Sequence, residues 1–74
     1  MATQQDIDNW FTYHAPVGDQ QARYVAIRDK AKEFAELINL STRPCADQTA
    51  ALRKLRETVM AVNLTIACNE SETP

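Results

Sequence analysis

Apolar residues recur at intervals of three and four along two long segments of the chain. In the first segment, residues 19–40, the repeating positions are Tyr24, Ile27, Ala31, Phe34 and Ile38. In the second, residues 45–69, they are Leu52, Leu55, Val59, Val62 and Ile66. This spacing places apolar side chains on one face of a helix, where they can pack against another helix. The link at residues 41–44 is short, so the two helices are expected to run antiparallel as a hairpin.

The segment before the hairpin carries weaker signals. Residues 6–11 fit a short helical turn, and Pro16 and Gly18 then interrupt the chain. Asp19 is a candidate N-cap of the first long helix, because its carboxylate can accept hydrogen bonds from free backbone amides. We expect residues 70–74 to be a disordered tail. The expected fold is therefore all-α and a single domain over residues 1–74, with a short N-terminal helical turn and an antiparallel two-helix hairpin.

A second apolar strip predicts that the hairpin assembles into a homo-oligomer. Met60, Leu64 and Ala67 lie beside the first apolar face of the second helix, with Asn63 among them. A single partner helix cannot cover both strips, so we expect the second strip to meet other subunits. The alternative is that the N-terminal segment folds back over it. A chain of 74 residues with much alanine also has a thin core, for which oligomerisation is the usual remedy.

Composition and charge argue against several classes of function. The net charge of −2 disfavours a protein that coats DNA or RNA, because such binding needs a broad cationic face. The single Gly cannot build a glycine-rich phosphate loop. One His and two distant Cys cannot build a tetrahedral metal site. No nucleophile has an evident base and orienting partner. We therefore expect no enzyme, no cofactor and no bound metal.

The sequence also suggests a compartment. Its N-terminus is polar and its apolar runs are short, so we expect neither a secretory leader nor a membrane span. We therefore expect the protein to be cytoplasmic.

Cys45 and Cys68 fall near opposite ends of one predicted helix, about 34 Å apart at ~1.5 Å per residue. A disulfide cannot span that distance, and both thiols are expected to be reduced.

The stretch Trp10–Arg28 is the most distinctive part of the chain. It holds four of the five aromatic residues, the only His and the only Gly. One interpretation is that the aromatics seal the open end of the hairpin, since each buries a large area. The other is a ligand site, because nucleobases stack on flat side chains such as Tyr13 and His14. Phosphates bind Arg or Lys, and the candidate cations are Arg23, Arg28 and Lys30.

The cations do not all face one way. Arg23 and Arg28 are five residues apart and hence about 140° apart around a helix. They cannot easily contact one ligand from one subunit. We therefore expect Arg28 or Lys30 to meet an aromatic residue of a neighbouring subunit, and Trp10 and Phe11 to be packing residues.

Several of these positions together resemble a known family. In the N-terminal half they are Phe11 to Pro16, Asp19, Gln20, Arg23, Tyr24, Ile27 and Arg28. Farther along they are Pro44, directly before the second helix, and within that helix Leu55, Val59, Met60, Asn63, Ile66 and Ala67. Over residues 10–69 the chain is similar to the phage anti-CBASS cyclic-oligonucleotide sponges, which share a hairpin domain with some sponges that block Thoeris signalling. The resemblance implies sequestration without cleavage in the cytoplasm of an infected bacterium. It also implies a hexamer of two trimers.

The resemblance suggests ligands and roles as well. It implies cyclic dinucleotides such as 3′,3′-cyclic GMP–AMP at subunit interfaces, with Tyr13 stacking on a base. Arg28 is the first candidate to contact a phosphate, and Lys30 is the second. Some members also hold cyclic trinucleotides on the threefold axes, using an Arg where this chain has Cys68, which argues against that pocket here. The rival hypothesis is a module that docks on a host protein through its aromatic N-terminal segment. A nucleic-acid-binding accessory factor is disfavoured by the acidic balance.

Overall fold

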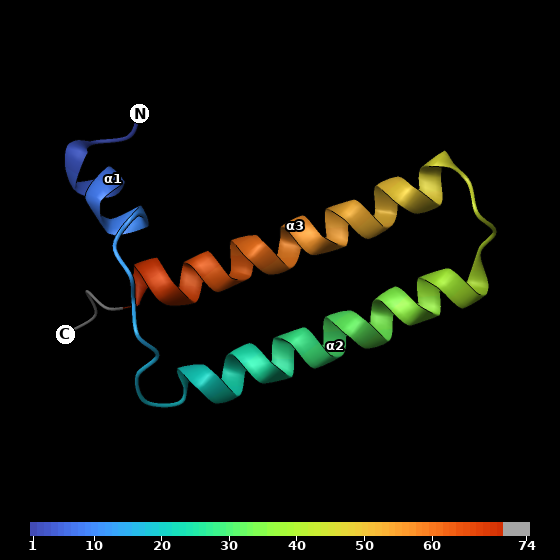
Figure 1. Ribbon diagram of the computed structural model, residues 1–74, viewed down its shortest axis with the longest axis horizontal. Helices are drawn as coiled ribbons and strands as arrows, with labels where there is room; N and C mark the ends of the chain where they lie inside the picture. Colours follow the sequence, from blue (N-terminus) through green and yellow to red (C-terminus); the bar gives the residue numbers. More distant parts are fainter. Residues whose placement is uncertain (71–74) are drawn as a thin grey trace.

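The computed structural model describes residues 1–70. It contains three helices, α1 (Gln4–Trp10), α2 (Gln20–Ser41) and α3 (Ala46–Asn69). The two long helices run antiparallel, and α1 lies against the C-terminal end of α3 (Figure 1). Residues 1–70 contain no strand. The all-helical hairpin expected from the apolar spacing is confirmed. Of the expected tail, residues 71–74 lie outside the described part of the chain, and Glu70 is not disordered but ends α3 as its C-cap.

The first helix begins two residues before its predicted start and ends one residue before its predicted end. The backbone amide of Asp6 donates to Oγ1 of Thr3 at 3.1 Å, and the amide of Thr3 donates to Oδ2 of Asp6 at 2.9 Å. This reciprocal pair is a capping box, which satisfies two backbone donors that a helix start otherwise leaves free. The cap explains why so short a helix forms at this position.

The entry into α2 is a turn that depends on Gly18. Its φ of 57° lies in the left-handed region, which L side chains adopt only at a cost. Asp19 follows, but its side chain makes no capping hydrogen bond. The predicted N-cap position is therefore confirmed, whereas the predicted capping by its carboxylate is wrong. Its Oδ1 instead accepts from Nε of Arg23 at 3.1 Å, because a guanidinium one turn along offers a charged donor.

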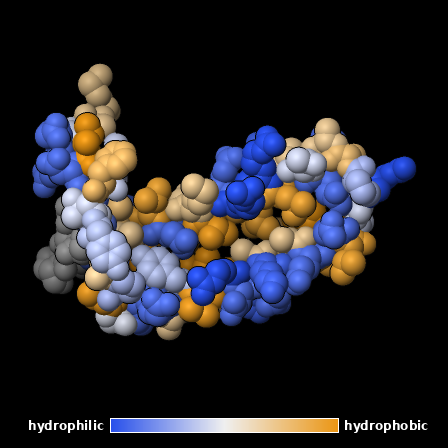
Figure 2. All heavy atoms as spheres, viewed as in Figure 1, coloured by the Kyte–Doolittle hydropathy of each residue, from blue (hydrophilic) through white to orange (hydrophobic). Residues whose placement is uncertain are grey.

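The core between the long helices is thin, as expected for so small a chain. The hydrophobic residues buried within residues 1–70 are Ile66 and Cys68. The predicted face of α3 is half-buried or buried throughout, whereas on α2 Phe34 is exposed and Ala35 takes the inward position. Figure 2 shows hydrophobic atoms exposed between the two long helices, bordered by hydrophilic side chains. One copy of the chain therefore leaves much apolar surface open to solvent.

Candidate functional site

The open end of the hairpin is tied together by Gln20, a buried polar residue with 8% of its surface exposed. Its Oε1 accepts from the backbone amide of Val17 at 3.0 Å, and its Nε2 donates to the carbonyl oxygen of Ile66 and to Oε1 of Glu70, each at 3.3 Å. The loop before α2, the first turn of α2 and the end of α3 therefore form one connected structure. Tyr13 and His14, two of the predicted ligand residues, lie in the segment just before these hydrogen bonds.

Arg23 strengthens the same end. Its Nη1 and Nη2 donate to Oε2 and Oε1 of Glu70 at 2.8 and 2.6 Å. These bonds lower the pKa of Glu70 to about 2, against the opposing effect of its partial burial, and they raise the pKa of Arg23. Arg23 was a candidate ligand cation, but its guanidinium holds two carboxylates of its own chain. We therefore assign it a structural role and leave it out of the proposed site.

The aromatic segment is held by Asn9. Its Nδ2 donates to the carbonyl oxygen of Cys68 at 2.8 Å, and its own carbonyl oxygen lies 2.8 Å from Nε2 of His14. A carbonyl oxygen only accepts, so Nε2 of His14 carries the proton and Nδ1 is left out of this bond. The ring of His14 is therefore fixed in orientation through Asn9, which is itself bonded to α3.

Tyr13 and His14 form one wall of an open cleft of about 530 Å³. Other residues that line it are Tyr24, Met60, Asn63 and Leu64. Met60 and Leu64 remain 63% and 53% exposed, so the N-terminal segment folds toward the second apolar strip without covering it. Asn63 contributes a buried side-chain oxygen that has no hydrogen-bond partner within the described residues. We name this hollow the aromatic cleft.

A second hollow, of about 580 Å³, lies between α2 and α3 and holds three cationic residues. Arg28 and Lys32 come from α2 and Arg56 from α3, and the apolar lining includes Leu55, Val59 and Met60. We name it the basic groove. Met60 lines both hollows, so the aromatic cleft and the basic groove adjoin along α3. Tyr13 and Arg28 were expected to reach a ligand from different subunits, yet within one chain they line adjoining hollows.

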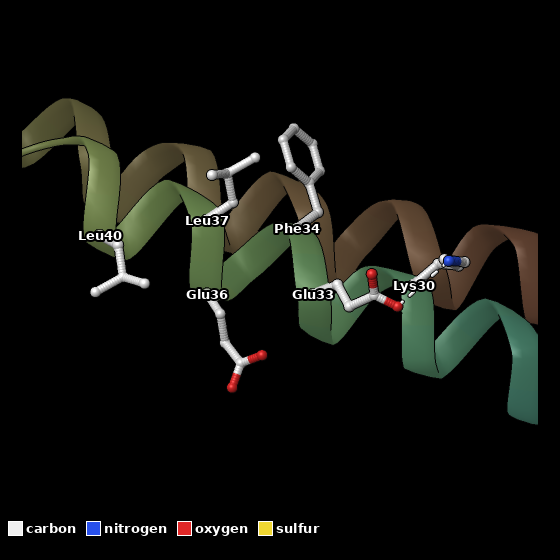
Figure 3. A pocket seen from close by; sticks show the side chains of 6 residues that line it. All are labelled: Lys30, Glu33, Phe34, Glu36, Leu37 and Leu40. Atoms are coloured by element: carbon white, nitrogen blue, oxygen red, sulfur yellow. Dashed lines mark ion pairs between the residues drawn. The ribbon is translucent and has the colours of Figure 1, made fainter.

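Lys30 lies elsewhere. Its Nζ is 3.4 Å from Oε2 of Glu33, and it lines a shallow hollow with an apolar ridge of Phe34, Leu37 and Leu40. Figure 3 shows these side chains on α2 alone, with Phe34 and Leu37 pointing the same way and the Lys30–Glu33 pair beside them. The predicted second cation is therefore not one of the residues that line the basic groove. Lys32 and Arg56 do line it and were not among the predicted residues.

Trp10 and Phe11 also differ from expectation. They were interpreted as packing residues, but Phe11 is 85% exposed and Trp10 is half-exposed. The helix α1 ends at Trp10, with Phe11 as its C-cap, and both rings stay open to solvent.

The fold and these two hollows define a small helical-hairpin module with an aromatic cleft and an adjoining groove lined by three cations. Over residues 3–67 the chain matches the family described as Acb2/Tad1, hairpin domain. It belongs to that family, whose members are anti-CBASS and anti-Thoeris sponges, and the resemblance seen in the sequence is thereby confirmed. The family implies a phage sponge for cyclic oligonucleotides. No curated protein and no solved structure matches the chain.

Three further features concern the whole described chain. Within residues 1–70, no group of three or more His, Cys, Asp or Glu residues is arranged to hold a metal ion. None of the helices in this part of the chain is long and apolar enough to cross a membrane. Cys45 is exposed, Cys68 is buried, and both are free thiols.

Proposed function

We propose that this protein sequesters cyclic dinucleotide second messengers of bacterial CBASS defence and does not cleave them. One observation carries the proposal beyond family membership, namely that the aromatic cleft adjoins the basic groove at Met60. A cyclic dinucleotide has two flat bases on a ring with two phosphates. The cleft supplies aromatic faces for a base, and the groove supplies cations for the phosphates.

The proposed contacts follow from this arrangement. Tyr13 stacks on a base, and its 84% exposed side chain leaves a face free for the ligand. His14 borders the same base with its ring edge. Arg28 pairs with a phosphate from the adjoining groove. Stacking contributes about 1–3 kcal/mol per base, and a nanomolar sponge needs about −12 kcal/mol in all, so several such contacts must act together.

We further propose that the protein works as a homohexamer built from two trimers, as the family resemblance implies. Both hollows are open in one copy, and Met60, which separates them, is mostly exposed. A second copy placed over these hollows would exclude water from the ligand, which strengthens charge pairing. The thin core gives an independent reason for assembly, because large apolar side chains on both long helices stay exposed.

Binding and release test the proposal together. The protein is titrated with 3′,3′-cyclic GMP–AMP in a calorimeter, and the complex is then heat-denatured and the released ligand is analysed by chromatography. We expect tight binding with a stoichiometry close to one ligand per site, and we expect the released ligand to be intact. The absence of binding heat contradicts a sponge for this ligand. Recovery of cleaved ligand means that the protein is an enzyme.

A second candidate function is docking on a host protein through the N-terminal segment. The exposed rings of Trp10 and Phe11 favour it, because exposed aromatic residues are enriched where proteins meet. The double variant Trp10→Ala, Phe11→Ala separates the two functions. A sponge keeps its ligand affinity and its activity against host defence in this variant, whereas a docking module loses that activity.

A further inference from the structure

The basic groove concentrates positive charge that the protein does not neutralise. The ion pairs within residues 1–70 are Arg23 with Asp19 and Glu70, and Lys30 with Glu33. In this part of the chain Arg28, Lys32 and Arg56 take part in none, although the protein as a whole has more acidic than basic residues. Three unpaired cations therefore gather along one groove of a protein with a net negative charge.

The helical register brings these cations together. Arg28 and Lys32 are four residues apart on α2, so they lie on the same face one turn apart. Arg56 reaches the same groove from α3. Like charges at this spacing repel in the free protein by a few tenths of a kcal/mol, and all three side chains are exposed and free to contact a ligand. An anion bound in the groove would remove this repulsion.

We propose that Lys32 and Arg56 form a second phosphate-binding pair for the same ligand, next to Arg28. This inference rests on the proposed function and adds to it the residues that hold the second phosphate. Arg28 lies at the end of the groove nearest the cleft, because Tyr24, one turn before it on α2, lines the cleft. Lys32 lies one turn farther away, with Arg56 across the groove.

Charge complementarity identifies the occupant as a small dianion. A cyclic dinucleotide carries two phosphates joined in one ring, so both negative charges arrive together. One end of the groove opens into the aromatic cleft at Met60, so a base attached to that ring has a place beside Tyr13. Three cations against two phosphates leave no ligand charge unpaired.

Three single variants test the inference in the full chain. Lys32→Ala and Arg56→Ala each remove one groove cation. Lys54→Ala is the matched control, since it also removes one charge from α3 but lies about 160° around the helix from Arg56. Each protein is titrated with 3′,3′-cyclic GMP–AMP at two salt concentrations, and its melting temperature and mass are measured without ligand. We expect Lys32→Ala and Arg56→Ala to weaken binding about tenfold or more and to reduce its salt dependence, with an unchanged or higher melting temperature.

Each outcome decides the inference. If both groove variants bind as tightly as Lys54→Ala while Tyr13→Ala binds weakly, the second phosphate pair is wrong and the proposed function stands. If the groove variants change the mass of the ligand-free protein, Lys32 and Arg56 act in assembly instead of in phosphate binding, and the inference is overturned. If the wild-type protein binds no ligand, the proposed function fails and this inference fails with it.

Discussion

Arg23 and Glu70 are joined by two hydrogen bonds between 2.6 and 2.8 Å, although 46 residues separate them in sequence. The pair closes the end of the hairpin opposite the turn between α2 and α3. At that turn Nε2 of Gln48 donates to the carbonyl oxygen and to Oγ1 of Thr42. The two long helices are thus fastened at both ends by polar contacts, while the middle is left as a groove.

The Arg23–Glu70 pair predicts a specific dependence of stability on pH. The folded-state pKa of Glu70 is about 2, below its ordinary value of 4.5. Its stabilising effect is therefore fully present above pH 4.5 and is lost as the pH falls toward 2. We expect Glu70→Gln to lower the melting temperature at pH 7 and to flatten its fall in acid. Circular dichroism melts from pH 7 to pH 2.5 would show this, and parallel curves for the two proteins would contradict it.

Asn9→Ala should loosen the aromatic segment. The variant leaves the carbonyl oxygen of Cys68 without its donor in a part-buried position, which costs about 1 kcal/mol or more. Urea denaturation measures the loss. Asn39→Ala, which changes an exposed residue on α2, is the matched control and should cost much less. Equal effects in the two variants would mean that Asn9 does not anchor α1.

Tyr13→Ala and Arg28→Ala should each weaken binding of 3′,3′-cyclic GMP–AMP by about tenfold to a hundredfold, since each removes one stacking or charge-assisted contact. Lys30→Ala should leave the ligand affinity nearly unchanged, because Lys30 lies beside Phe34 and Leu37 and does not line the basic groove. Calorimetry of the three variants, with light scattering to follow the mass, makes the comparison. A large loss in Lys30→Ala with none in Arg28→Ala would reverse the assignment.

The exposed ridge predicts assembly. Phe34, Leu37 and Leu40 project from α2 and remain more than half exposed. Light scattering should report a particle much heavier than the 8.3 kDa chain. Leu37→Lys should lower that mass, because a charge replaces an apolar group at a contact. Leu37→Met, which keeps the apolar character, should not. A wild-type monomer would exclude the proposed hexamer.

The spacing of apolar residues was enough to predict the hairpin, because two helices that pack against each other each need apolar residues at intervals of three and four. It was not enough to orient individual charges. Arg28 and Lys30 are two residues apart, which turns a side chain by about 200°, whereas Arg28 and Lys32 differ by only about 40°. The same helical geometry that predicted the apolar face would have selected Lys32 for the groove.

Side-chain contacts account for the other errors. Asp19 is the N-cap residue of α2, but its carboxylate accepts from Arg23, four residues along, in place of the backbone amides. Arg23 looked free because Glu70 was assigned to a disordered tail, and no local pattern connects the two. The capping box of Thr3 and Asp6 was different, since its spacing lies within one turn and could have been recognised from the sequence.

The near absence of buried apolar residues has a consequence for how the protein would behave in an infected cell. Within residues 1–70 the buried hydrophobic residues are Ile66 and Cys68, so whatever covers the surface contributes much to the folding free energy. By mass action, any molecule that binds only the folded form stabilises it further as its concentration rises. Under the proposed function that molecule is the alarm signal of the host. A bacterium that answers infection by making more signal would then extend the lifetime of the protein that removes it.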